Sequence, residues 1–268
     1  MFYQCFLKFV LASRLRGNDG AGIFRSIDDT PQGRTISESA NHHTQENRMD
    51  KQNLLHLLQT RSTCKQYDPA RTVSDDDFAF LLEAARLSPS SFGFEPWRFV
   101  VVQSPELRQL IGTHAWGAKD KIGACSHFVL ILARLANTLH ADAPYIMHMM
   151  QNVHGIAREA AEARRERYRT FCEQDFALYP HEPRSFYDWA CKQCYIALGN
   201  MLTAAQAAGI DATAVEGFPL ETLNRALAER GVYDGGTFKL AVMAAFGYRA
   251  DPPRPKTRQS LDDIVAWV

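Results

Sequence analysis

Two short clusters of basic residues combine charge and hydroxyl groups in a pattern that suits a phosphate. Residues 61–65 read Arg-Ser-Thr-Cys-Lys, and residues 256–258 read Lys-Thr-Arg within a proline-rich stretch. Arginine offers a planar fork to phosphate oxygens, lysine offers a mobile point charge, and hydroxyls add hydrogen bonds. Four such cations brought together would hold a dianionic phosphate, whereas each cluster alone is more simply interpreted as solvated surface charge.

Two loops between these clusters have the composition of a binding site for a flat ligand. Residues 88–97 read SPSSFGFEPW, which mixes proline, glycine and serine with three aromatic residues. Backbone groups are free in such a loop and aromatic rings can stack on a ligand. Residues 215–218 read VEGF, and Gly217 permits a close approach of ligand to backbone. An ordinary helix-to-strand turn is the alternative for the first loop.

The elements that must position these residues alternate between helical and strand patterns. Apolar periodicity predicts helices at residues 53–60, 75–88, 105–114, 156–171, 186–208 and 219–230, with a short final helix after Ser260. β-branched and apolar runs predict strands at residues 98–103, 127–133, 211–215 and 238–248. Neither a linker nor a repeat divides residues 49–268, so we expect a single α+β domain.

Several helix boundaries follow from capping patterns. N-caps are expected at Ser74, Ser104, Ser185 and Ser260, and Gly209 is expected to end the long helix. In the first helix, four leucines should be buried, namely Leu54, Leu55, Leu57 and Leu58.

Residues 1–48 lack a sustained pattern and are rich in glycine and polar residues. The apolar stretch at residues 2–12 is interrupted by Lys8 and has no basic residue before it, which argues against a secretory signal. We expect residues 1–48 to be a disordered tail or a mis-assigned start upstream of Met49, and residues 49–268 to form the functional domain.

Charge and composition exclude several classes of protein. The 268 residues contain 30 basic and 30 acidic side chains, so the chain lacks the positive field that coats nucleic acid or anionic membranes. No apolar run approaches the length of a membrane span. Six cysteines are too few for a disulfide scaffold, which favours a cytoplasmic protein.

Other chemistries lack their sequence signatures. Neither G-x-G-x-x-G nor the P-loop motif occurs, so a Rossmann dehydrogenase and a P-loop NTPase are disfavoured. Cys191 and Cys194 have the spacing of a redox pair, but they lie in the middle of a predicted helix rather than at its N-terminus. A single such pair is half of a zinc site, so we expect no metal centre.

Taken together, these motifs resemble the nitroreductase family of FMN-dependent NAD(P)H oxidoreductases. The resemblance covers nearly all of residues 49–268 and rests on five motifs in the family's order. They are RSTCK at 61–65, SPSS…EPW at 88–97, SHFVL at 126–130, EGF at 216–218 and PKTR at 255–258. It implies a three-layer fold, in which helices flank a mostly antiparallel sheet, and an intertwined homodimer with two shared FMN sites.

The resemblance also implies a role for individual residues. Those expected to hold FMN from one subunit are Arg61, Ser62, Thr63, Lys65, Lys256 and Arg258. The backbone N–H of the Glu216–Gly217 segment is expected to face flavin N5. A loop lent by the partner subunit is expected to supply Pro89, Ser90, Ser91 and Gly93, and Gln193 is a further match from that partner.

Two departures from the family pattern bear on the site. The family commonly has asparagine near Ala118, so Lys121 is a candidate to replace that flavin contact. Phe92 stands where the family often has a polar residue, which would place an aromatic face near the substrate. No side chain is required as a general acid or base.

The implied activity is transfer of hydride from NADH or NADPH through flavin N5 to a nitroaromatic, a quinone or a related small-molecule acceptor, in ping-pong fashion. The protein would supply position and electrostatics, with Lys65 stabilising the reduced flavin anion. Two alternatives remain at this level. The protein could bind flavin without catalysis, or the arginine-rich stretch at residues 158–169 could bind nucleic acid or a protein partner.

Overall fold

A four-stranded antiparallel sheet lies at the centre of the fold. The computed structural model describes residues 50–268, and the expectations for residues 1–48 lie outside this range. The strand order is β1-β2-β4-β3, and the strands are β1 (Trp97–Val101), β2 (His127–Arg134), β3 (Asp211–Val215) and β4 (Phe238–Gly247). The predicted strands are therefore confirmed, with the ends of three of them adjusted by one or two residues.

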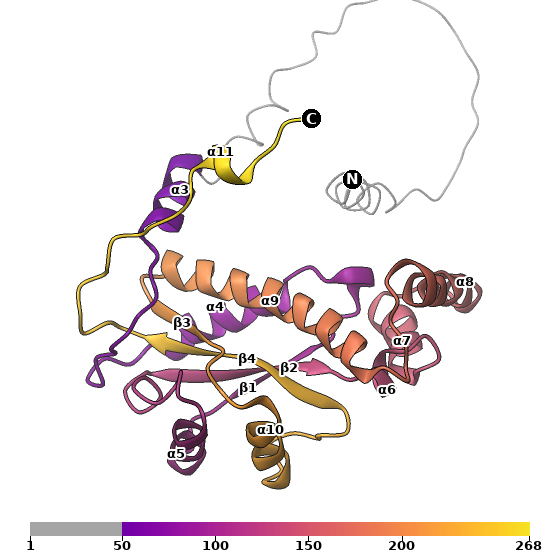
Figure 1. Cartoon of the computed structure of the whole chain (residues 1–268), viewed down its shortest axis with the longest axis horizontal. Coiled ribbons are helices and arrows are strands. Elements are labelled where there is room, and N and C mark those ends of the chain that lie inside the picture. The colour runs from indigo at the N-terminus through magenta and orange to yellow at the C-terminus, as the bar shows by residue number, and fades with distance from the viewer. Residues whose placement is uncertain (1–49) are drawn as a thin grey trace, which may run out of the picture. The chain divides into compact units, whose positions relative to one another are not determined.

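Helices cover both faces of the sheet and make three layers (Figure 1). One face carries α4 (Asp75–Arg86) and α9 (Pro183–Ala207), and the other carries α5 (Pro105–His114) and α10 (Leu220–Glu229). This arrangement confirms the predicted α+β class and the layered architecture.

The two central strands are apolar on both sides because each side packs on a separate core. In β2, Val129 and Ile131 face the α9 layer, whereas Phe128, Leu130 and Leu132 face the α5 and α10 layer. A β-bulge shifts the register between β2 and β4 at Ile131/Leu132, and it reverses which β4 residues face each layer. The continuous apolar run of β2 thus follows from burial on both faces.

Most helix starts agree with the capping patterns. The hydroxyl oxygens of Ser74, Ser104 and Ser260 accept hydrogen bonds from the backbone N–H three residues later. The prediction for Ser185 is wrong, because α9 begins earlier, at Pro183, and the Ser185 hydroxyl donates instead to the carbonyl of Glu182. Past the end of α9, Gly209 has a φ of +69°, as expected for a helix-terminating glycine.

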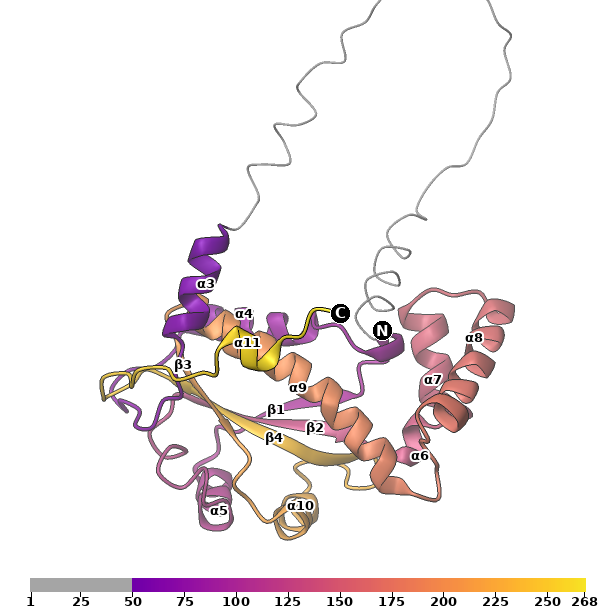
Figure 2. The ribbon, with the colours of Figure 1, turned by 45° about the horizontal axis from the view of Figure 1, so that its top comes forward.

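A helical lobe occupies residues 136–175 at one end of the sheet (Figures 1 and 2). It contains α6 (Ala136–Leu139), α7 (Pro144–His148), η2 (Met149–Val153), α8 (Arg158–Thr170) and η3 (Phe171–Asp175). Its buried aromatic side chain, Tyr168, donates a 2.7 Å hydrogen bond to the carbonyl of Leu139. The lobe also packs on the short turn η1 (Ser91–Gly93), which lies within the loop before β1.

At the other end lie α3 (Lys51–Thr60) and the short α11 (Leu261–Ile264) (Figure 2). The expectation of buried leucines in α3 is wrong for a single chain, because α3 has no buried residue. Leu54, Leu55 and Leu58 are 37–49% exposed. None of the helices in residues 50–268 combines the length and apolarity needed to cross a membrane.

Candidate functional site

Three of the predicted phosphate-binding cations lie together beside the C-terminal end of α3. The segment around residue 256 passes this end, where the Lys256 ammonium donates to the carbonyl of Leu58. Partial desolvation lowers the pKa of Lys256, and the positive charges of Arg61 and Arg258 lower it further. Two segments separated by almost 200 residues thus meet in a cluster of like charge, which we call the cation cluster (Arg61, Lys256 and Arg258).

The cation cluster lacks internal compensation. Across residues 50–268, neither its three members nor Lys65 forms an ion pair with an acidic side chain. Like charges held together without a counter-ion repel each other, so an anion bound there is stabilised by all of them. The donor set of two guanidinium groups and an ammonium matches the oxygens of a phosphate.

Lys65 belongs to the same segment as Arg61 but lines a separate hollow. With Thr63 it lines a small hollow whose other wall includes Arg249 and Arg254. Arg249 is itself neutralised, because its guanidinium donates to Asp211 at 2.6 Å. The same guanidinium donates to the hydroxyl and the carbonyl of Ser62 at 3.2 Å, so Ser62 is used as an internal contact.

The segment that carries these residues is fastened to the edge of the sheet. The carbonyl of Cys64 accepts a 2.6 Å hydrogen bond from Thr213 on β3, and Tyr67 donates to the carbonyl of Ala245. Burial raises the pKa of the Cys64 thiol to about 11, so this thiol is held protonated. Sequence reasoning missed the Asp211–Arg249 pair, because the two residues are 38 positions apart and belong to no recognised motif.

The Glu216–Gly217 segment packs backbone to backbone against residues 116–121. The N–H of Gly117 donates to the carbonyl of Gly217 at 2.8 Å. Lys121 donates to the carbonyl of Gly117 at 3.0 Å, so its ammonium already has a partner within the chain. The ring of Trp116 lies so close to Gly217 that an added Cβ would meet it at 2.7 Å, although Trp116 is 78% exposed.

The Glu216 side chain is held by α9. The Tyr195 hydroxyl donates to the Glu216 carboxylate, and burial together with this acceptor raises the pKa of Tyr195. Sequence reasoning missed both Trp116 and Tyr195, since neither stands in a motif. Together they cover and fasten the segment whose backbone is predicted to face the flavin.

The loop at residues 88–95 is held against α9 and the helical lobe. Gln193 is buried and accepts a 2.9 Å hydrogen bond from the N–H of Ser91. Asn200 donates to the Ser88 hydroxyl at 2.8 Å. The ring of Phe92 packs among Phe94, Tyr168 and Phe171 rather than standing free, so any contact with a substrate stays a prediction.

This loop and the cation cluster lie beside different parts of α9. Gln193 contacts the loop, while Gln206 contacts Thr60 at the end of α3. Thirteen residues of helix separate these two contacts, which corresponds to about 20 Å. Within one chain, Ser91 is therefore set well apart from the end of α3, although Ser88 at the start of the loop contacts α9 closer to that end, at Asn200.

The cysteine pair on α9 has the wrong electrostatics for thiol redox chemistry. Burial raises the pKa of Cys191 to about 11, and Cys194 is fully buried with a pKa well above its usual value. A reactive thiol needs the opposite shift, because the thiolate is the nucleophile. The sulfur of Cys194 instead donates to the carbonyl of Leu132.

Several arginines of α8 are paired or hydrogen-bonded within the chain. Arg169 forms a two-pronged pair with Asp142 at 2.6 and 2.8 Å and also contacts Glu166. Arg158 pairs with Glu162, and Arg164 donates to the carbonyl of Phe92. These contacts favour a structural role for α8 over a surface for nucleic acid.

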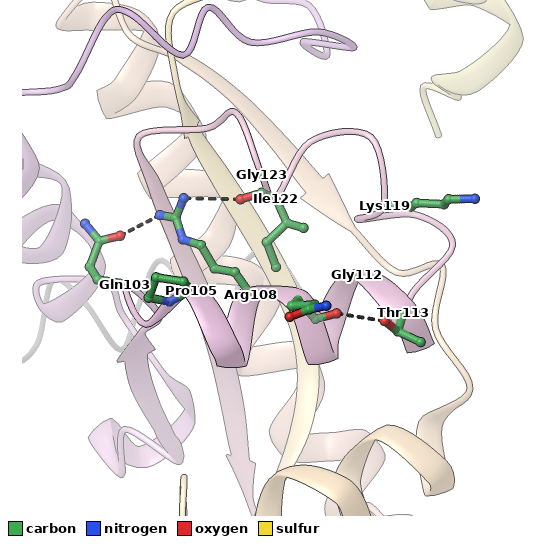
Figure 3. Close-up of a pocket in the computed structure, with 9 residues that line it drawn as sticks. Gln103, Pro105, Arg108, Gly112, Thr113, Lys119, Ile122 and Gly123 are labelled. Carbon is green, nitrogen blue, oxygen red and sulfur yellow. Dashed lines mark hydrogen bonds between the residues drawn. The ribbon is translucent and has the colours of Figure 1, made fainter.

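A pocket of about 760 Å³ lies away from these groups, between α5 and residues 119–123 (Figure 3). Arg108 reaches across it, and all five N–H groups of its guanidinium are used. They donate to Gln103 and to the carbonyls of Val102, Ile122, Cys125 and Ser126. None of the predicted flavin-binding residues lines this pocket, so it is a surface hollow stiffened by Arg108.

Comparison with solved structures places the fold in one class. A nitroreductase-like protein of Streptococcus mutans superposes with a TM-score of 0.67 at 18% identity, over 82% of this chain and 100% of that chain. A candidate nitroreductase of Exiguobacterium sibiricum, solved in complex with FMN, gives a TM-score of 0.62 at 19% identity, over 82% of this chain and 98% of that chain. The architecture is that of the nitroreductase fold.

Sequence comparison identifies the family. Residues 58–248 match the profile of the nitroreductase family. YfkO of Bacillus subtilis, a candidate NAD(P)H nitroreductase, is 44% identical over 218 residues, which cover 81% of this chain and 98% of YfkO. The chain belongs to the nitroreductase family and is an oxidoreductase. The family and the enzyme class predicted from the sequence are therefore confirmed.

Proposed function

We propose that this protein binds FMN and uses NADH or NADPH to reduce nitroaromatics, quinones or related small acceptors. The observation that carries the proposal is the cation cluster, in which Arg61, Lys256 and Arg258 meet without an acidic partner in residues 50–268. A dianionic phosphate group is the ligand that best offsets their mutual repulsion. In support, a structural neighbour was solved with FMN and YfkO is described as an NAD(P)H nitroreductase.

Bound FMN would supply the redox chemistry, namely ping-pong transfer of hydride from the nicotinamide through N5 to the acceptor. The chain's residues supply position and charge. Arg61, Lys256 and Arg258 hold the phosphate, and Lys65 provides positive charge for the flavin ring edge. The Glu216–Gly217 segment, which Gly117 and Tyr195 keep in place, would offer a backbone N–H to flavin N5.

The proposal includes a homodimer in which each FMN contacts both chains. The separation of about 20 Å along α9 between the Ser91 contact and the end of α3 supports this arrangement, because a second copy would bring its loop to a flavin held on the cation cluster. Exposed apolar side chains on α3, and Trp267 at 94% exposure near the C-terminus, offer surface for that contact. In this dimer the leucines of α3 become buried, as the sequence pattern predicts.

Residues 49–268 are proposed as the flavin-binding domain. The 218 residues aligned with YfkO cover nearly all of that protein, which supports a domain of this length. The cytoplasmic location expected from the cysteine content stays a prediction.

Steady-state assays with each nicotinamide and a panel of nitroaromatics, quinones and enones test the activity. We expect oxidation of NADH or NADPH that depends on the acceptor, with parallel lines in double-reciprocal plots. Retained FMN without acceptor-dependent oxidation would instead identify a flavin-binding protein without this activity. Light scattering tests the dimer, and a monomer that retains FMN would contradict the shared site.

A further inference from the structure

The loop before β1 has a backbone that departs from ordinary conformations at three of four consecutive residues. Phe92 has a φ of 58°, Gly93 of 71° and Glu95 of 45°. The left-handed region is unfavourable for phenylalanine and glutamate, since both carry a Cβ. Such a segment persists only when its surroundings hold it in place, and such segments are concentrated at functional sites.

Three side chains of the helical lobe hold the carbonyls of this loop. Arg164 on α8 donates to the carbonyl of Phe92 at 3.1 Å, and His154 Nε2 donates to that of Gly93 at 2.9 Å. The hydroxyl of Tyr145 on α7 lies 2.8 Å from the carbonyl of Phe94 and 3.1 Å from that of Glu95. The carbonyls of Phe92 and Gly93 thus each have a donor, and those of Phe94 and Glu95 share the single O–H of Tyr145, from 50–72 positions away in the sequence.

The protonation of His154 and the burial of Arg164 indicate that these side chains are placed to donate to the loop. Because the carbonyl of Gly93 is an acceptor only, Nε2 of His154 must carry the proton. Nδ1 of His154 is buried and has no partner among the residues described. Arg164 is half-buried, so its position costs solvation, and burial followed by the charge of Arg167 lowers its pKa. A cation placed there for solubility alone would lie outward, as Arg158 does on the same helix.

Aromatic rings of the helical lobe also pack against the aromatic side chains of this loop. Phe92 meets Tyr168 and Phe171 edge to face, with ring centroids 5.0 Å apart in both pairs. Phe94 is fully buried and meets Tyr168 at 4.8 Å. The lobe therefore fixes both the side chains and the backbone of the loop, while Gln193 on α9 holds Ser91 from the other side.

We propose that Tyr145, His154 and Arg164 are positioning residues that hold residues 90–95 in their strained conformation, and that this conformation sets the flavin-facing surface of the loop. The second half of this inference rests on the proposed function. The helical lobe thus acts on the FMN site through the loop, without touching the flavin itself.

Hydrogen exchange followed by mass spectrometry tests the first half on the flavin-free chain. His154→Leu and Arg164→Leu each remove a hydrogen-bond donor, and Tyr145→Phe removes only a hydroxyl. His154→Gln keeps an N–H at about the position of the imidazole Nε2. Arg158→Leu, on the exposed face of α8, is the matched control. We expect exchange at the amides of residues 91–95 to accelerate about tenfold in His154→Leu and Arg164→Leu. His154→Gln should restore it, and Arg158→Leu should leave it unchanged.

Unchanged amide exchange in residues 91–95 of His154→Leu and Arg164→Leu would overturn the proposal that these side chains hold the loop. So would equal acceleration in β2 and β4, because that result would mean general destabilisation. For the second half, the FMN dissociation constant should rise about tenfold in His154→Leu and recover in His154→Gln. A loosened loop with unaltered FMN affinity would refute the link to the flavin. If the unsubstituted protein binds no FMN at all, the proposed function fails. The exchange result still decides whether Tyr145, His154 and Arg164 hold the loop.

Discussion

Gly117→Ala tests the close contact that positions the Glu216–Gly217 segment. An ideal Cβ at Gly117 would lie 3.0 Å from both the Cα and the N of Gly217, and 3.2 Å from Cγ1 of Val215. Carbon atoms prefer separations of about 3.5–4.0 Å, so the two segments must move apart by roughly 0.5 Å. They resist this movement because the N–H of Gly117 donates to the carbonyl of Gly217 at 2.8 Å.

The expected cost follows from two opposing effects. Overpacking against a backbone that cannot rotate away costs about 1–3 kcal/mol. Replacing glycine by alanine also restricts the unfolded chain, which offsets about 0.4–1 kcal/mol where φ is compatible, and Gly117 has no positive φ. The net loss of about 1–2 kcal/mol should lower the melting temperature by roughly 2–8 °C in a domain of this size.

Gly123→Ala is the matched control in the same segment. A Cβ at Gly123 meets no heavy atom within 4 Å, and its φ is also ordinary. Its melting temperature should therefore stay constant or rise by up to about 4 °C. Thermal unfolding followed by circular dichroism compares the two, and the fraction of FMN retained after gel filtration should fall only in Gly117→Ala. Equal melting temperatures for both variants would refute the contact.

Three further outcomes are expected. Combined Lys256→Ala and Arg258→Ala substitution should release FMN, measured as flavin retained on purification, because the cation cluster loses two of its three charges. A chain that starts at Met49 should express in folded form and bind FMN with the affinity of the full chain, measured by fluorescence titration. His127 is buried and stacked on Phe78, and burial followed by Arg108 lowers its pKa from 6.5. The unfolded state therefore takes up the proton first, so the unfolding free energy should fall in denaturant titrations as the pH drops through about 6.5 and below. His127→Asn should lessen that fall.

Each of these has a control or a contradicting result. Removal of two exposed arginines, Arg225 on α10 and Arg230 directly after it, changes the net charge equally and should leave FMN bound. FMN retained by the Lys256 and Arg258 double variant would refute the phosphate assignment. Insolubility of the chain from Met49 would contradict the expectation of a dispensable tail. An identical pH dependence with and without His127 would mean that other groups control it.

Local patterns in the sequence predict the framework of the fold well. The limits of β3 are matched to the residue, and Ser74 and Ser104 start helices as their patterns indicate. These features depend on neighbouring residues alone, so periodicity and capping determine them. The same reasoning gives the motif at residues 61–65 and the Lys-Thr-Arg cluster, whose meeting is a consequence of the fold.

Features that depend on distant contacts are not available from local patterns. The leucine pattern of α3 predicts a buried face, but no residue of α3 is buried in the single chain, because burial depends on what packs against the helix. Ser185 has the pattern of an N-cap, yet Pro183 starts the helix earlier. Arg249 and His154 act on segments 187 and 61 positions away, so no spacing rule could have found either contact.

Flavin content with nicotinamide bleaching is the most direct test of the central claim. The purified protein, reconstituted with FMN and gel-filtered, should carry about one FMN per chain. Its flavin absorbance should bleach when NADH or NADPH is added without oxygen, and it should return when a nitroaromatic or quinone follows. A colourless protein that cannot be reconstituted with FMN, or a bound flavin that neither nicotinamide bleaches, would contradict the account.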